Sequence, residues 1–424
     1  MKGSKLFKNV RLKGQKELVS ILVEDGIFKK IAADIPQEKT VGCEEVDLNG
    51  QLVVPPYVDP HLHLDYVFTA SLGEENGSGT LFEGIQRWSE SKGNMTVEQM
   101  KERIYSGIKK EMLYVRGTDL FCSDHIDVTD PTFTGLKAAL EVRDEVKDLL
   151  DLQIVAFPQE GMYAYKDGDK LVEEGLKMGA DCVGAIPHFE LAREFGEKSI
   201  HKTIELAVKY NKLIDVHCDE TDDTQSRFLE LLNALALMEG IGTRTTASHT
   251  CSFGSADNSY AFRMMKLFKK SGINFISCPT ENVYLEGRQD TYPKRRGITR
   301  VKELYDNGIN VCFAQDSMSD PWYPLGNGDM MMILDHGIHL AQMMSPEEIT
   351  NVLDLVTTNG AVTMNITDHY GIEENKPANF IVLDAKSEFE AICERAGITA
   401  SVRHGEFLFK KIPAKVTEAI DLLK

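Results

Sequence analysis

The sequence predicts an α/β protein: a (β/α)8 TIM-like barrel with a small β-sandwich domain formed by both chain termini. Two observations predict this fold. About eight short apolar runs are each followed by a polar, helix-like stretch, and most runs are too continuously apolar for a half-exposed antiparallel strand. The two ends of the chain instead alternate apolar and polar residues, which is typical of strands with one solvated face.

The predicted barrel strands follow one another with room for a helix between them. In chain order they are residues 52–58, 120–126, 152–157, 182–186, 213–218, 244–248, 273–278 and 309–313. We therefore place the barrel at residues 56–371 and the β domain at residues 1–55 and 372–424. Residues 6–31, 380–384 and 402–409 are expected to supply strands of the β domain that pair in antiparallel fashion.

Composition excludes several classes of partner. The chain has 424 residues, of which 42% are hydrophobic, so it can bury a large core. Its 47 Lys and Arg against 66 Asp and Glu give a net charge of -19, which would repel a nucleic-acid backbone. No apolar run approaches the roughly 18 residues of a membrane span, and the first residues lack the apolar core of a signal peptide. We expect a cytoplasmic homo-oligomer that binds neither nucleic acid nor membrane.

Polar residues end most of the predicted barrel strands. In a (β/α)8 barrel the catalytic side chains come from the carboxyl ends of the strands, so these residues are candidates for the active site. They are His61 and His63, Gln159 and Glu160, His188, His217 and Glu220, His249, and Asp316 and Ser317.

The histidines predict a metal site. His61 and His63 stand two residues apart, which places both imidazoles on one face of a strand. His217, His249 and Asp316 are expected to converge on them from other strand ends. Imidazole nitrogens with one carboxylate suit zinc or iron(II). Two further strand-end histidines, His125 and His188, are predicted to have structural, hydrogen-bonded roles.

Six segments spread over nearly the whole chain resemble bacterial cytosine deaminases, a branch of the amidohydrolase superfamily. They are PYVDPHLHLD at 56–65, VAFPQEG at 155–161, VHCDE at 216–220, ASHT at 247–250, YPKRRGITR at 292–300 and DPWYPLG at 320–326. The resemblance implies a set of metal ligands, namely His61, His63, His217 and Asp316. It also implies that Glu220 transfers protons and that His249 lies beside the hydrolytic water, so the predicted catalytic residues are Glu220, His249 and Asp316.

The same resemblance implies a substrate pocket. Gln159 would read the amide edge of the ring, and Trp322 would lie near the pocket mouth. The full predicted substrate-binding set is Gln159, Ser317, Trp322, Tyr66, Glu281 and Leu81.

A single divalent ion per chain, zinc or iron(II), is expected. Binuclear amidohydrolases carry a carboxylated lysine at the end of the fourth strand, and residues 180–188 contain no lysine. A bound divalent ion lowers the pKa of water to about 7, which makes hydroxide available at neutral pH. Glu220 could then protonate a ring nitrogen while the adjacent carbon is attacked, and ammonia would leave.

Three residues depart from the cytosine deaminase pattern. Ser317 stands where that branch has a second aspartate, Tyr66 where it has threonine, and Glu281 where it has apolar residues. The expected substrate is therefore a small heterocycle, either cytosine or a substituted cytosine, with creatinine as the alternative.

Two alternatives belong to other classes of function. A ring-opening cyclic amidase is disfavoured by the missing lysine. A non-catalytic metal-binding protein is disfavoured because every catalytic position is filled. Release of ammonia from a panel of heterocycles would separate these hypotheses.

Overall fold

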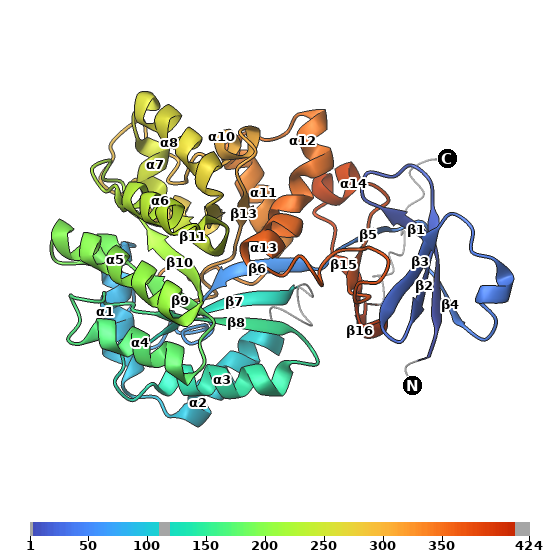
Figure 1. Cartoon of the computed structure of the whole chain (residues 1–424), viewed down its shortest axis with the longest axis horizontal. Helices are drawn as coiled ribbons and strands as arrows, with labels where there is room; N and C mark the ends of the chain where they lie inside the picture. The colour runs from blue at the N-terminus through green and yellow to red at the C-terminus, as the bar shows by residue number, and fades with distance from the viewer. Residues whose placement is uncertain (1–2, 110–118, 412–424) are drawn as a thin grey trace, which may run out of the picture. The chain divides into compact units, whose positions relative to one another are not determined.

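The computed structural model describes residues 3–109 and 119–411 (Figure 1). Two compact units make up the chain: Pro55–Gly371, and Met1–Val54 together with Ile372–Lys424. Residues 412–424 of the predicted β domain lie outside the described part. Within the described residues, no helix is both long enough and apolar enough to cross a membrane.

The unit Pro55–Gly371 is a (β/α)8 barrel, as the sequence predicts. In the described part of the chain its sheet has eight strands in sequence order, and neighbouring strands pair in parallel. They are β6 (Tyr57–Leu62), β7 (Asp119–Asp127), β8 (Asp151–Phe157), β9 (Cys182–Ala185), β10 (Leu213–Cys218), β11 (Thr245–His249), β12 (Asn274–Ser277) and β13 (Val311–Phe313). A parallel bridge between Leu62 and Asp316 brings the chain after β13 to β6 and so closes the ring.

Helices connect the barrel strands and surround them (Figure 1). Parallel strands require such crossovers, and the strands are apolar because both of their faces are covered. The helices are α1 (Leu81–Lys92), α2 (Val97–Gly107), α3 (Thr134–Val146), α4 (Gly168–Met178), α5 (Arg193–Tyr210), α6 (Phe228–Glu239), α7 (Cys251–Ser255), α8 (Asn258–Ser271), α9 (Pro279–Leu285), α10 (Val301–Asp306), α11 (Met330–Ala341), α12 (Pro346–Asn351) and α13 (Thr358–Thr363). Short 3-10 turns lie at Pro187–Phe189, Gly242–Arg244 and Val352–Val356.

The prediction of a single first barrel strand at residues 52–58 is wrong. This segment is divided into β5 (Leu52–Val54) and the start of β6. Pro55 and Pro56 separate the two pieces because proline has no backbone N–H to donate to a ladder. As a result β5 belongs to the terminal unit and β6 to the barrel.

Both chain ends build the separate β domain. Its strands are β1 (Lys5–Leu12), β2 (Val19–Glu24), β3 (Ile27–Ala32), β4 (Glu44–Asp47), β5, β14 (Phe380–Leu383), β15 (Ile398–Arg403) and β16 (Glu406–Lys410), with α14 (Glu388–Cys393) between β14 and β15. Its apolar core includes Phe7, Phe28 and Phe380, and Phe7 meets Phe380 edge-to-face at 5.0 Å.

The strands predicted in this domain pair in antiparallel fashion, as expected, but two further strands pair in parallel with β1. β1 pairs antiparallel with β2 but parallel with β4 and β5. Residues 33–43 connect β3 to β4 and contain a 3-10 turn at Gln37–Lys39. This crossover returns the chain to the start of β1, so that β4 begins beside Lys5 and runs in the same direction.

Candidate metal centre and substrate cavity

Four predicted ligands converge at the carboxyl ends of the barrel strands. His61 Nε2 and His63 Nε2 each lie 3.2 Å from His217 Nε2, and Asp316 Oδ1 lies 3.4 Å from His63 Nε2 and 3.7 Å from His61 Nε2. Ligands held tetrahedrally at zinc bond lengths are about 3.4 Å apart. The spacing of these four atoms therefore fits one divalent ion.

The ionisation of these groups also suits a metal. Burial, followed by neighbouring imidazoles, lowers the pKa of His61, His63 and His217 well below the usual value, so each ring is neutral and keeps a lone pair. Burial, followed by the charge of Asp320, raises the pKa of Asp316. A divalent cation at this point would favour the ionised carboxylate that a ligand must be.

Hydrogen bonds on the outer side of two rings orient them towards the centre. His61 Nδ1 lies 3.0 Å from Ser248 Oγ, and the Ser248 hydroxyl donates to Asp215 Oδ1. His63 Nδ1 lies 2.9 Å from the backbone oxygen of His125. With Nδ1 donating outward, Nε2 carries the lone pair that faces the other ligands.

Sequence reasoning missed Asp215 as a functional residue. Asp215 stands two residues before His217 on β10, and this spacing places both side chains on one face of the strand. The alternation of side chains along the strand was therefore the feature of the sequence that could have identified Asp215.

The two histidines predicted to be structural lie at different distances from the centre. The ring centroid of His125 is 3.9 Å from that of His61, and its Nε2 is 3.4 Å from Asp215 Oδ2. His188 is half-buried in the 3-10 turn after β9 and takes no part in the donor groups found among the described residues.

Replacing Ser248 with alanine is expected to weaken metal binding by about 10- to 100-fold, because loss of an outer hydrogen-bond partner typically costs that much. Competition with a chromogenic chelator measures the change. Ser252→Ala, a buried serine that bonds the Ser226 carbonyl, is the matched control. Equal metal affinity in the two variants would contradict the orienting role of Ser248.

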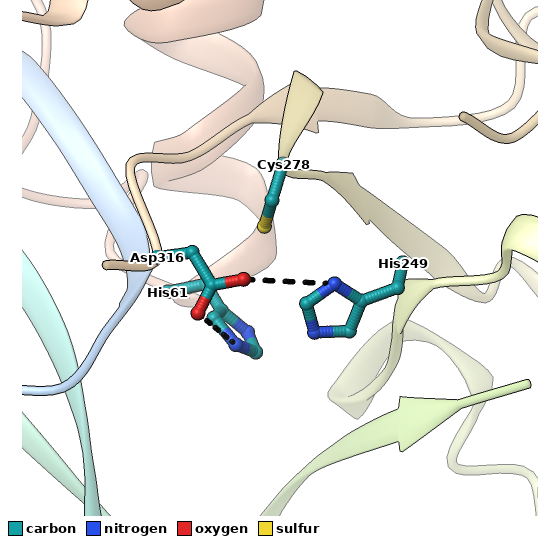
Figure 2. A group of neighbouring side chains, drawn as sticks. All are labelled: His61, His249, Cys278 and Asp316. Carbon is teal, nitrogen blue, oxygen red and sulfur yellow. Dashed lines mark ion pairs between the residues drawn. The ribbon is translucent and has the colours of Figure 1, made fainter. Parts of the chain in front are cut away.

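A second group of possible ligands shares two residues with the first. Figure 2 shows the carboxylate of Asp316 paired with both His61 and His249, with the Cys278 sulfur pointing towards it. Burial raises the pKa of Cys278 well above that of an ordinary thiol, and this group offers two imidazoles where the first offers three. The set with three neutral imidazoles is therefore the better metal site, which leaves His249 for another task.

His249 and Glu220 form a proton-handling pair next to the ligands. Glu220 Oε1 lies 3.3 Å from His249 Nδ1, which is also 3.7 Å from Asp316 Oδ2. Burial, followed by the charge of Asp316, raises the pKa of Glu220 well above its usual range. Glu220 can therefore hold a proton near neutral pH beside the ligands.

Asn282 on α9 fixes this pair, and sequence reasoning missed it. Its side-chain Nδ2 donates to Glu220 Oε1 over 2.9 Å, and its Oδ1 lies 3.3 Å from His249 Nδ1. No motif or spacing distinguishes Asn282 in the sequence, because it meets Glu220 only through the fold.

One cavity adjoins the metal ligands and Glu220. Its wall contains every predicted substrate-binding residue; the lining is Tyr66, Leu81, Gln159, His217, Glu220, Glu281, Asp316, Ser317 and Trp322. The Tyr66 ring stacks on His63 at 4.5 Å and lies 4.5 Å from the Trp322 ring. Gln159 is buried, and its Oε1 has no hydrogen-bond partner within residues 3–109 and 119–411. A buried amide oxygen without a partner is unusual in a folded protein, so this group is a candidate for contact with a ligand.

Comparisons with known proteins agree with this site. The chain matches the profile of the Amidohydrolase family over residues 127–409. It is similar to the crystal structure of 5-methylcytosine deaminase from Klebsiella pneumoniae liganded with phosphonocytosine, with 46% identity, a TM-score of 0.93, and coverage of 97% of this chain and 100% of that chain. The cytosine deaminase-like branch predicted from the sequence is confirmed.

Two curated relatives also match over most of their length. N-isopropylammelide isopropyl amidohydrolase of Pseudomonas sp. (strain ADP) is 29% identical, covering 96% of this chain and 97% of the relative. Pterin deaminase of Rhizobium rhizogenes (strain K84 / ATCC BAA-868) is 25% identical, covering 93% and 88%. These matches and the family profile show that the chain belongs to the amidohydrolase family and is a hydrolase.

Proposed function

We propose that this hydrolase removes the exocyclic amino group of a cytosine ring that carries a 5-substituent, and that 5-methylcytosine is a better substrate than cytosine. The observation that carries the proposal is the composition of one cavity wall, which brings together the ligands His217 and Asp316, the acid Glu220 and the unpaired amide of Gln159. The 46% identity to the Klebsiella 5-methylcytosine deaminase supports the same substrate class.

The chemistry divides among the residues of this wall. When bound, a divalent ion supplies an acidified water at neutral pH. Gln159 holds the amide edge of the ring, and Glu220 gives a proton to the ring nitrogen as the water oxygen adds to the neighbouring carbon. His249 and Asp316 hold and pass the remaining protons. The tetrahedral carbon then collapses, the bond to the exocyclic nitrogen breaks, and that nitrogen leaves as ammonia.

Ser317 is the residue we assign to selection of the 5-substituent. It follows the ligand Asp316 directly and lines the cavity. Its side chain offsets part of the rise in pKa that burial causes in Glu281 and Asp320. An aspartate here would occupy more space and add a third buried carboxyl group beside those two, whereas serine is smaller and neutral.

The wild-type protein is expected to have a higher kcat/KM for 5-methylcytosine than for cytosine, and to turn over creatinine least. Ser317→Asp is expected to reduce the preference for 5-methylcytosine by about 10- to 200-fold, the usual worth of one methyl group in a pocket. Ammonia release from the three compounds, measured in parallel on the metal-loaded protein, tests this.

Two further variants separate size from charge at position 317. Ser317→Thr fills space without adding charge, and Ser317→Ala removes only the hydroxyl. We expect the threonine variant to lose preference for 5-methylcytosine and the alanine variant to keep it. If cytosine is the best substrate of the wild-type protein and Ser317→Asp leaves the ranking of the three compounds unchanged, Ser317 does not select the 5-substituent. Faster turnover of creatinine than of either pyrimidine would show that the substrate is creatinine rather than a cytosine.

A further inference from the structure

The last turn of α1 is held to the barrel by a buried charge network. Lys92 Nζ donates to Asp127 Oδ2 at 2.8 Å, to Thr129 Oγ1 at 2.9 Å and to Glu160 Oε2. Only 12% of the Lys92 side chain is exposed. Burial alone would lower the pKa of Lys92, but Asp127 and Glu160 raise it above the usual value. One ammonium group therefore compensates two carboxylates at the ends of neighbouring strands.

Other residues of α1 complete the network. Trp88 Nε1 donates to Asp127 Oδ2 over 2.9 Å, and Ser89 Oγ donates to Glu160 Oε1 over 2.8 Å. Three side chains within one turn or so of the helix, at positions 88, 89 and 92, thus contact Asp127 at the carboxyl end of β7 and Glu160, three residues after β8 ends.

This network leads directly to the cavity wall. Glu160 is the neighbour of Gln159, whose amide has no other anchor among the described side chains. The backbone N–H of Asp127 donates to Asp65 Oδ2 over 3.0 Å, and Asp65 precedes Tyr66. Trp88 packs against Tyr66 with ring centroids 5.2 Å apart. Two lining residues are thus positioned from the Lys92 end of α1.

The first turn of α1 is fixed to the cavity as well. Trp322 Nε1 donates to the Leu81 carbonyl over 3.2 Å, and both residues line the cavity. A Cβ at Gly84 would lie 2.5 Å from Trp322 Cδ1 and Nε1, so only glycine lets the helix approach the indole this closely. α1 is therefore attached to the cavity wall at its first turn and to the barrel at its last turn.

We propose that Lys92 is a positioning residue that seats α1 on the barrel and, through Glu160 and Asp127, sets Gln159 and Tyr66 for the substrate. The expected kinetic effect rests on the proposed function, because Gln159 holds the ring in that assignment and Tyr66 lines the same cavity. Lys92 does not contact the metal ligands, so its loss should weaken substrate binding and leave the metal in place.

The test compares Lys92→Met with Lys101→Met. Lys101 Nζ also joins two carboxylates, Glu141 Oε2 at 2.8 Å and Glu145 Oε1 at 2.9 Å, but it does so between α2 and α3. We expect Lys92→Met to raise KM by about tenfold or more with full metal content and with kcat within about threefold. Lys101→Met should leave both constants unchanged, and Lys92→Arg, which keeps the charge, should recover most of the lost affinity.

A second readout needs no substrate. The chain has two tryptophans, Trp88 and Trp322, and both belong to this assembly. In a Trp322→Phe background the remaining emission comes from Trp88. Lys92→Met is expected to shift that emission to longer wavelength and to increase its quenching by acrylamide. Without Lys92, Asp127 is no longer held in place, and water reaches the Trp88 indole that bonds it. Lys101→Met should change neither property.

A double variant keeps the proposal testable if Lys92→Met folds poorly. Lys92→Met with Glu160→Gln removes one of the carboxylates that would be left unpaired, and it should still show the raised KM and the shifted Trp88 emission. Wild-type KM and emission in the double variant would show that Lys92 only neutralises charge, and would overturn the positioning role. If the wild-type protein turns over none of the pyrimidines, the proposed function fails, and the fluorescence comparison alone decides the role of Lys92.

Discussion

Replacing Glu220 with glutamine is expected to lower kcat by about 10² to 10⁴, the usual contribution of a general acid or base. The amide keeps the shape of the carboxyl group and can accept the hydrogen bond from Asn282 Nδ2 that Glu220 Oε1 accepts now. It cannot give up and take back a proton. Steady-state ammonia release from the best substrate of the wild-type protein measures the loss.

Metal content and folding should stay unchanged in this variant. Glu220 is not one of the four converging ligands, so elemental analysis should give the same metal per chain as the wild type. Glu230→Gln on α6, which pairs with Arg263 at the surface, is the matched control and should have wild-type kcat. Wild-type turnover in Glu220→Gln would assign Glu220 to orienting His249 rather than to proton transfer.

Replacing Asp316 with alanine is expected to abolish metal binding and activity together. Asp316 supplies the single carboxylate of the donor set, 3.4 Å from His63 Nε2. Loss of an outer partner costs about 10- to 100-fold in metal affinity, so loss of a direct ligand should cost more. The wild type should contain one ion per chain by elemental analysis, and Asp316→Ala and His61→Ala should contain almost none.

Thermal unfolding gives an independent measure of the same site. An ion at a thousandfold excess over its Kd stabilises the folded state by about 4 kcal/mol, so zinc should raise the Tm of the wild type and leave that of Asp316→Ala unchanged. Asp306→Ala on α10 and the exposed His336→Ala on α11 are the controls for the two ligand variants. Two ions per chain at full activity would contradict the mononuclear site, and unchanged metal content in the ligand variants would contradict the ligand assignment.

The sequence by itself predicted the barrel and the residues that meet at its carboxyl end. Apolar runs of strand length separated by helix-like segments are local features, and a closed parallel barrel places the carboxyl end of every strand on one face. For that reason His61, His217 and Asp316, which are far apart in the chain, could be assigned to one site. The period-2 alternation of strands also put His61 and His63 on the same face.

Only the tertiary structure decided how the residues between strands contact one another. Asn282 reaches Glu220 across 62 residues, and Lys92 reaches Asp127 and Glu160 across 35 and 68 residues. Such contacts depend on the register of short helices and loops, which carry no periodic signal. Strand pairing in the β domain was likewise decided by its crossover connection. Local patterning therefore fixes which side chains face the barrel mouth, whereas long-range packing fixes which of them hold each other in place.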